Sequence, residues 1–177
     1  MRLFFGLEIP ANTALAIADW RERQFPPMGR PVPVANFHIT LAFVGECSEP
    51  ALDRLCRDVD ERLERQMQHG ASMTLSRVGY WPKPGICWLG PSDPPVALEQ
   101  LARCLQQSAL AVGARRERRS YQPHLTLFRR CEIPPPAPTE AADFRLGWHR
   151  FTLYESVAGR QGVHYQPLAE WPLAQGD

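Results

Sequence analysis

The sequence predicts an α+β protein made of two related lobes, and three patterns support this prediction. The tetrapeptide HITL at positions 38–41 recurs as HLTL at positions 124–127. Each copy lies in an apolar run typical of a β-strand, and a helical pattern precedes each run. Hairpin signals, which are paired strand patterns around a tight turn, occur elsewhere in the chain. The halves share a helix-then-strand plan, so we expect two intimately packed lobes in one domain over residues 1–177.

The chain begins with a predicted strand and a predicted helix. Residues 2–9 form an apolar run that Pro10 interrupts, which is typical of a β-strand. Residues 11–25 carry a helical pattern, and two prolines end it because proline lacks the amide hydrogen that a helix interior needs. The proline-rich residues 28–33 are expected to form a loop that leads into the first motif.

The first motif strand has alternating character, which predicts one buried face. Side chains two positions apart share a face of a strand. His38 and Thr40 are therefore predicted on the face away from the core, and Phe43 is predicted on the core face. The apolar positions are Ala35, Phe37, Ile39, Leu41 and Phe43, and the other face holds Asn36, His38, Thr40 and Ala42.

Two amphipathic helices and a hairpin are predicted between the motifs. Residues 48–70 begin with the capping hydroxyl of Ser48 and carry apolar side chains at helical spacing. Residues 72–80 and 86–89 are predicted to pair as a hairpin around a Pro/Gly turn. Residues 94–113 predict a further helix with one apolar face.

The second motif is flanked by a basic run and by proline. Residues 115–119, RRERR, are either a solvated loop or a contact for an RNA backbone. The proline-rich residues 134–138 predict a stiff extended loop. Residues 151–157 and 162–168 predict a final hairpin.

Composition limits the class of protein. With 177 residues, 44% hydrophobic, the chain can bury a sizeable core, and a net charge of +1 means that any nucleic acid needs a local basic patch. The five cysteines are odd in number and lack a CxxC pair, which disfavours a disulfide framework or a zinc ribbon. No apolar stretch approaches the ~20 residues that span a bilayer, and the N-terminus lacks a signal-peptide pattern. We expect a cytoplasmic protein.

The paired motifs bring histidine and threonine to the same strand face. Histidine exchanges protons near neutrality because its ordinary pKa is ~6.5. A threonine hydroxyl donates a hydrogen bond where negative charge builds on a phosphoryl oxygen. Two His-x-Thr pairs converging on one cleft would supply an acid, a base and a phosphate cradle. Threonine is a poor zinc ligand, so we expect no metal and no cofactor.

Two His-x-Thr-x motifs half a chain apart resemble the 2H phosphoesterase superfamily, and within it the bacterial RNA 2′,3′-cyclic phosphodiesterases of the 2′-5′ RNA ligase family. Nearly the whole chain takes part in this resemblance. The matching segments are RLFFGLEIP, NFHITLAFVGE, VGYWPKPGICWLG, PHLTLFRR and FTLYES. The resemblance implies a bilobed α+β fold in which two antiparallel sheets flank a central cleft, helices pack outside, and a pseudo-twofold axis relates the lobes.

The resemblance also implies an activity and the roles of individual residues. The activity is metal-independent hydrolysis of terminal 2′,3′-cyclic phosphates on RNA to 2′-phosphates. His38 would be the general acid and His124 the general base, an order that the sequence does not distinguish from its reverse. Thr40 and Thr126 would hold the phosphate, together with an arginine after the second motif.

Two details near the second motif stay open at this stage. The resemblance favours Arg129 as the phosphate-binding arginine, whereas strict alternation from His124 places Arg130 on the site face unless the strand bulges. The same alternation makes Phe128 a candidate for stacking a terminal base. Trp81 and Trp88, in the predicted hairpin, are expected in the core.

Other functions compete with the leading one. The substrate is alternatively a 2′-5′-linked oligonucleotide or a small cyclic nucleotide, and the same site could work in reverse as a ligase. A non-catalytic RNA-binding module is a third possibility, which the intact motifs disfavour. The expected partner is an RNA end with a 2′,3′-cyclic phosphate, with no metal and no membrane, and we expect a monomer.

Overall fold

The computed structural model describes residues 1–176, which form two four-stranded antiparallel sheets, a two-stranded sheet and three α-helices. The first sheet has the order β10 (Gly162–Pro172), β9 (Arg150–Gly159), β1 (Arg2–Glu8), β3 (His38–Glu46). The second has the order β2 (Arg30–Pro31), β7 (Leu125–Arg129), β6 (Ile86–Gly90), β5 (Arg77–Trp81). The small sheet pairs β4 (Ala71–Leu75) with β8 (Phe144–Trp148). The helices are α1 (Ala11–Gln24), α2 (Glu49–Arg65) and α3 (Val96–Ala111), and a 3₁₀ turn η1 spans Val34–Asn36.

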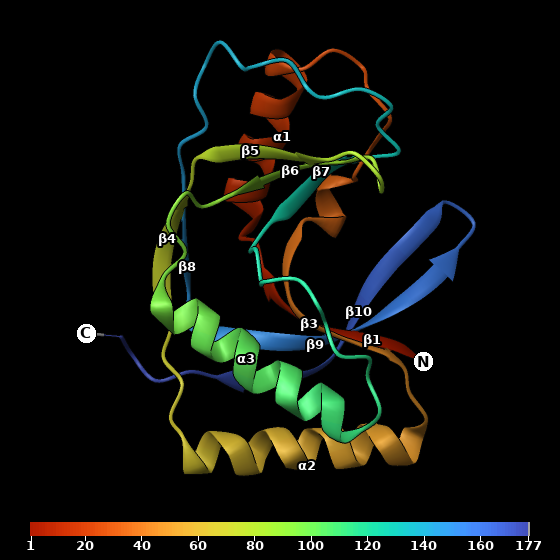
Figure 1. The fold of residues 1–177 in the computed structure, drawn as a ribbon, viewed down its shortest axis with the longest axis vertical. Coiled ribbons are helices and arrows are strands. Elements are labelled where there is room, and N and C mark those ends of the chain that lie inside the picture. Colours follow the sequence, from red (N-terminus) through yellow and green to blue (C-terminus); the bar gives the residue numbers. More distant parts are fainter. Residues whose placement is uncertain (177) are drawn as a thin grey trace.

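The molecule has two lobes, one for each motif strand. We call the first sheet with α2 and α3 the β3 lobe, and the second sheet with α1 the β7 lobe. In Figure 1 the β7 lobe is at the top and the β3 lobe is below it, while β4 and β8 run along one side between them. This arrangement confirms the predicted α+β class with antiparallel sheets in two lobes.

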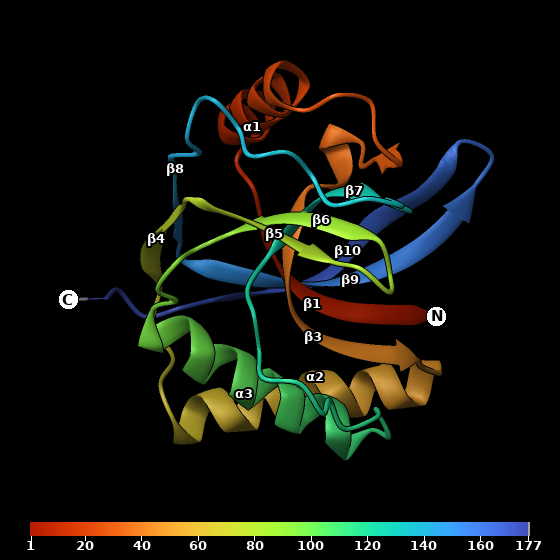
Figure 2. The same cartoon turned by 45° about the horizontal axis from the view of Figure 1, so that its top comes forward.

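The helix that precedes each motif strand in sequence packs on the lobe of the other motif strand. The helix α1 precedes β3 in sequence but lies beside the β7 sheet, where Phe25 packs edge-on against Phe128 at 6.2 Å between ring centroids. Conversely, α3 precedes β7 but packs on β3 (Figure 2). The predicted helix-then-strand repeat is therefore present in sequence order, but each helix covers the other motif's lobe.

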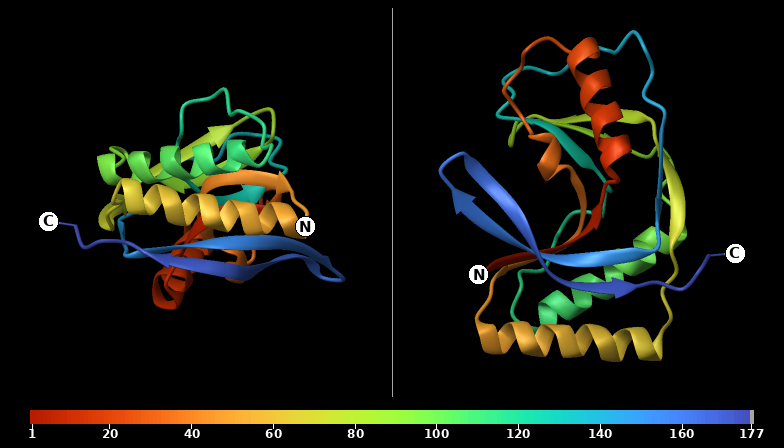
Figure 3. Two further views of the ribbon diagram at one scale, coloured as in Figure 1. Left: turned by 90° about the horizontal axis from the view of Figure 1, so that it is seen from below. Right: turned by 180° about the vertical axis from the view of Figure 1, so that it is seen from behind.

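Two helices cover the outer face of the β3 sheet. Seen from below, α2 and α3 run side by side across it (Figure 3). The hydroxyl of Ser48 caps α2 by accepting the amide hydrogen of Ala51 at 3.3 Å, as the sequence predicts. Leu55 and Val59 of α2 are fully buried. The apolar sides of these helices thus cover one face of the sheet. The opposite face, which carries His38, remains uncovered by α2 and α3.

Some predicted elements differ from the structure in extent. Residues 72–80, predicted as one strand, are two strands in different sheets, because the chain turns at Ser76 from β4 into β5. The second of these strands, β5, pairs with β6, which confirms the predicted hairpin. The strands β2 and β8 were not predicted. The final hairpin is confirmed, and β10 continues to Pro172.

Both motif strands contain a β-bulge directly after the threonine. Opposite β1, Thr40 pairs with Gly6 and Ala42 with Phe5, so the register skips Leu41. Opposite β6, Thr126 pairs with Trp88 and Phe128 with Cys87, so the register skips Leu127. A bulge exchanges the two faces of a strand beyond it, and in β3 the register shifts again at Val44, after Phe43. The side chain five positions after each histidine therefore shares the histidine's face.

The bulges overturn two predictions about phenylalanines. Phe43, predicted in the core, is 66% exposed, whereas Phe128, predicted on the site face, is 4% exposed. Phe128 packs between Phe25 and the guanidinium of Arg21, which lies 5.5 Å from its ring centroid. Because its ring is enclosed on these sides, Phe128 has no surface on which a nucleobase could stack.

The five cysteines carry free thiols that are buried or partly buried. Burial raises the pKa of the Cys87 thiol to about 12, which keeps it protonated and unreactive. Within residues 1–176, no helix has the length and apolar character that a membrane span requires.

Candidate active site

His38 begins β3 with a ring whose two nitrogens have different partners. Its Nδ1 lies 2.8 Å from the carbonyl oxygen of Asn36 and its Nε2 lies 2.9 Å from Oγ1 of Thr40. A carbonyl only accepts, so Nδ1 carries the hydrogen in the neutral ring and Nε2 accepts one from the Thr40 hydroxyl. The ring nitrogen without a hydrogen is therefore Nε2, the one that contacts the threonine.

His124, directly before β7, repeats the Nδ1 contact of His38. Its Nδ1 lies 2.9 Å from the carbonyl oxygen of Gln122, which again stands two residues earlier in the chain. The same tautomer follows, with Nε2 free of a hydrogen. Thr126 is half-buried two positions further along the strand. The two lobes thus present two imidazoles in the same orientation relative to their strands.

Aromatic rings enclose both imidazoles. Phe4 and Tyr165 each lie 4.9 Å from the His38 ring, between centroids. Trp81 lies 4.6 Å from the ring of His124, and Trp88 lies 6.1 Å from it. Trp88 is buried as predicted, but Trp81 is only half-buried and forms part of the wall of the site.

This environment lowers both histidine pKa values. Burial is the main cause that lowers the pKa of His38 to about 4; the hydrogen bond to Asn36 opposes it, and positive charge on Arg129 and His124 adds to it. Burial also lowers the pKa of His124, again with a contribution from Arg129. Arg129 and His124 therefore lie near enough to His38 for their charge to lower its pKa, which makes these three side chains candidates for one site. Both shifts favour the neutral imidazole at neutral pH.

Arg129, not Arg130, is the arginine whose charge acts on the histidines. The bulge at Leu127 places Arg129 on the histidine face of β7. Arg130 adopts a left-handed backbone conformation with φ of 55° and begins the turn that leaves the strand. Of the two possibilities left open by the sequence, the structure has the bulged strand.

Two residues that support the site were not identified from the sequence. Arg21 of α1 is 5% exposed, and its Nη1 donates hydrogen bonds to the carbonyl oxygens of Val32 at 2.7 Å and Leu127 at 3.0 Å. The Tyr121 hydroxyl donates to the carbonyl oxygen of Thr40 at 2.8 Å. Arg21 thus links the segment before β3 to β7. Tyr121, in the segment before β7, binds β3. The sequence did contain a signal for Arg21. It stands seven residues after Ala14 and four after Ile17, a spacing that places it on the buried face of the helix.

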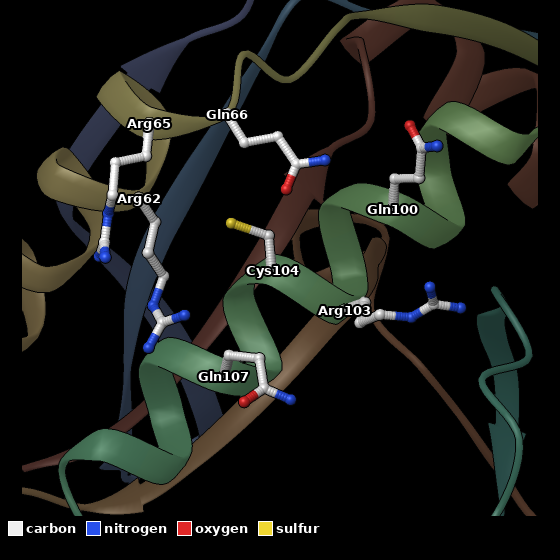
Figure 4. Close-up of a pocket in the computed structure, with 7 residues that line it drawn as sticks. All are labelled: Arg62, Arg65, Gln66, Gln100, Arg103, Cys104 and Gln107. Atoms are coloured by element: carbon white, nitrogen blue, oxygen red, sulfur yellow. The ribbon is translucent and has the colours of Figure 1, made fainter.

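Two hollows of the surface lie away from the motif residues. A groove of about 400 Å³ between α2 and α3 is lined by arginine and glutamine side chains, and Figure 4 shows it. A second hollow of about 500 Å³ lies beside the proline-rich segment 135–138. Neither includes a motif histidine. The candidate site is therefore identified by converging side chains and their pKa values, not by the depth of a cavity.

The chain is similar to known proteins in sequence and in fold. The model of the LigT like Phosphoesterase family matches residues 7–88 and 89–165, one motif in each segment. The chain is 38% identical to the RNA 2′,3′-cyclic phosphodiesterase of Escherichia coli strain K12, over 98% of this chain and 97% of that protein. It is 26% identical to the protein of the same name from Methanocaldococcus jannaschii, over 97% of this chain and 100% of that one.

Solved structures also have a similar fold. The structure of E. coli LigT complexed with 3′-AMP superposes with a TM-score of 0.87 at 37% identity, covering 98% of both chains. TT0787 of Thermus thermophilus shares the fold, with a TM-score of 0.80 at 23% identity over 100% of both chains. With a family model over most of its length, one histidine motif in each matched segment, and this degree of identity, the chain belongs to the LigT-like phosphoesterase family.

Proposed function

We propose that this protein is an RNA 2′,3′-cyclic phosphodiesterase that opens terminal cyclic phosphates to 2′-phosphomonoesters. The observation that carries the proposal is the pair of similar imidazoles, each with Nδ1 bound to a carbonyl and Nε2 without a hydrogen, together with one arginine whose charge lowers the pKa of both. Opening a cyclic ester needs one group that accepts a proton and one that donates a proton, and the two lobes supply one each.

The proposed reaction assigns one proton transfer to each histidine. Nε2 of His124 accepts a proton from water, and the oxygen of that water forms a bond to phosphorus. The bond from phosphorus to the ribose 3′ oxygen breaks, and this oxygen takes the proton from Nε2 of His38. The product keeps its phosphate on the 2′ oxygen. Each proton transfer typically contributes ~10²–10⁴-fold to the rate.

The substrate itself supplies the charge that the acid needs. A cyclic phosphodiester carries one negative charge, which raises the pKa of a nearby imidazole. We infer that substrate binding protonates His38, whose pKa is low in the free protein. The proton on Nε2 then releases the Thr40 hydroxyl from its role as donor to that nitrogen. Thr40, Thr126 and Arg129 would donate hydrogen bonds to the non-bridging phosphoryl oxygens, where charge grows in the transition state.

A product assay tests this proposal. Purified protein is incubated in EDTA with an oligoribonucleotide that ends in a 2′,3′-cyclic phosphate, and the product ends are mapped as 2′- or 3′-phosphates. We expect turnover in chelator, 2′-phosphate ends, and a loss of at least ~10²-fold in His38→Ala and in His124→Ala. His164→Ala is the matched control, because His164 is an exposed histidine on β10.

Each other outcome contradicts a stated part of the proposal. Full activity in either motif variant contradicts the two-histidine mechanism, and 3′-phosphate ends contradict the assigned polarity. Activity that EDTA abolishes contradicts the metal-independent step. Binding of the oligonucleotide with no hydrolysis would instead support a binding module, and joining of ends in place of hydrolysis would support a ligase.

A further inference from the structure

An exposed phenylalanine lies on the histidine face of β3. Phe43 is 66% exposed, while its neighbours Ala42 and Val44 are 4% and 7% exposed. Single exposed apolar side chains are common on protein surfaces. Phe43 differs from these because the bulge at Leu41 turns it onto the face that carries His38. Without that bulge, the alternation of the strand would place its ring in the core.

The ring of Phe43 continues an aromatic surface that begins at His38. Phe4 of β1 pairs in register with Phe43, and their ring centroids are 6.4 Å apart. The Phe4 ring in turn lies 4.9 Å from the His38 ring and stacks on Tyr154 at 5.3 Å. Tyr165 closes the group, 5.0 Å from Phe4. We call Phe4, Phe43, Tyr154 and Tyr165 the aromatic shelf.

The members of the shelf differ in what they can offer a ligand. Phe4 is 5% exposed, so its neighbours cover it and it serves as the base of the group. The two tyrosines are half-buried. Phe43 is therefore the member with a large free surface. That surface is connected to the imidazole proposed as the general acid through a single intervening ring.

We propose that Phe43 is the stacking surface for the base of the terminal nucleotide, the one whose ribose carries the cyclic phosphate. The proposal rests on the proposed function and names the part of the substrate that the shelf holds. Every nucleobase has a flat face that stacks on an aromatic ring, and such a contact is tolerant of sequence. A phenylalanine has no hydrogen-bonding group, so it selects for the presence of a base and not for its identity.

The second lobe supports this division of roles. The bulge in β7 gives Arg129 the position that Phe43 has in β3, five residues after the histidine. One lobe therefore directs a cation into the site and the other directs an apolar ring. A nucleotide end has a matching asymmetry, since its phosphate is charged and its base is flat and largely apolar.

Two substrates that differ only in the base test the proposal. Adenosine 2′,3′-cyclic phosphate has a base, and ribose 2,3-cyclic phosphate lacks one. For Phe43→Ala we expect kcat/KM on the adenosine substrate to fall about 5- to 150-fold, the factor that corresponds to the ~1–3 kcal/mol of one base–aromatic stack. The loss lies in KM, with kcat nearly unchanged, and the base-free substrate is hydrolysed as by the wild type.

Conservative and remote variants complete the experiment. Phe43→Trp restores the adenosine substrate because indole also offers a flat face. Leu15→Ala is the matched control, since Leu15 is an apolar side chain 60% exposed on α1, and it leaves both substrates unaffected. Equal losses on both substrates in Phe43→Ala would show a structural role and overturn the proposal, as would an unchanged KM for the adenosine substrate.

A binding measurement separates this proposal from the proposed function. Calorimetry with adenosine 2′-phosphate and ribose 2-phosphate needs no turnover. We expect Phe43→Ala to weaken binding of the adenosine ligand by the same factor of about 5 to 150 and to leave the base-free ligand unchanged. If the wild-type protein hydrolyses neither cyclic substrate, the proposed function fails, while this difference in affinity still decides whether Phe43 stacks a base. No difference in affinity would overturn the stacking proposal.

Discussion

We expect acid to destabilise this protein in part through the buried ring of His38. Burial lowers the pKa of His38 to about 4 in the folded state, whereas the ordinary value that applies to the unfolded chain is 6.5. Below pH 6.5 the unfolded chain binds a proton at this position and the folded protein does not, so the free energy of unfolding falls as the pH falls. The contribution of the neutral ring is fully present above pH 6.5. It is lost between pH 6.5 and 4.

The size of the effect follows from the two pKa values. A difference of one pKa unit corresponds to about 1.36 kcal/mol, so the loss reaches about 2 kcal/mol at pH 5 and about 3 kcal/mol at pH 4. Other groups titrate in this range, so the test compares the wild type with His38→Gln, which keeps a polar side chain but does not titrate. The stability advantage of the wild type over this variant is expected to shrink by about 2 kcal/mol from pH 7 to pH 5.

Urea unfolding followed by tryptophan fluorescence at pH 7, 6 and 5 measures this difference, and His149→Gln, at an exposed position, controls for the loss of a histidine as such. Comparing the two variants separates the effect of losing the buried His38 ring from the effect of losing an exposed histidine. An advantage that stays constant from pH 7 to pH 5 would refute the reasoning. It would mean that His38 is not held neutral by its surroundings, and the protonation of His38 by the substrate would lose its basis.

Four further predictions concern the site and its support. Burial lowers the pKa of both histidines in the free protein, so both limbs of the pH profile of kcat/KM should lie below the ordinary histidine pKa. The profile of kcat reports the enzyme–substrate complex, and its alkaline limb should lie at higher pH because the phosphate anion favours the protonated imidazole. Arg129→Ala should lower kcat by ~10²–10³-fold with Arg129→Lys in between, measured by steady-state kinetics, since a lysine keeps the charge but not the paired donors. Arg21→Met should cost about 3 kcal/mol in urea unfolding, because two charge-assisted hydrogen bonds are lost at once. Gly79→Ala should cost about 1–3 kcal/mol because its new Cβ would lie 2.1 Å from the Trp88 ring, whereas Gly147→Ala, whose Cβ would meet nothing closer than 3.8 Å, should be nearly neutral.

The sequence was sufficient for the features that depend on local patterns. Alternation places His38 and Thr40 on one face, and both share the face that meets Phe4 and Tyr165. Helical spacing predicts the buried faces of α2 and α3, and Ser48 predicts where α2 begins. Each of these depends on residues within one or two turns of one another, so a single stretch of sequence carries the necessary information.

Features that depend on a distant partner were not predicted. The bulges at Leu41 and Leu127 are defined by registers against β1 and β6, so nothing within either motif indicates them. The strand β8 was missed although Phe144, Leu146 and Trp148 alternate with exposed residues, because its partner β4 lies about 70 residues earlier. Such a short strand is recognisable only once its partner is known.

The two bulges also explain why strict alternation assigned the phenylalanines to the wrong faces. With the bulges, each motif extends to a longer unit in which histidine, threonine and a third side chain share one face, and the third is Phe43 in β3 and Arg129 in β7. The carbonyl of Leu127, the bulged residue, accepts hydrogen bonds from the amide of Val32 and from Arg21. A bulge held by contacts from other elements is a defined part of the fold and not a local irregularity. The orientation of Arg129 therefore depends on α1, a helix that contributes no side chain to the site. We accordingly expect Arg21→Met to lower kcat as well as stability, and steady-state kinetics on the folded variant measure that dependence.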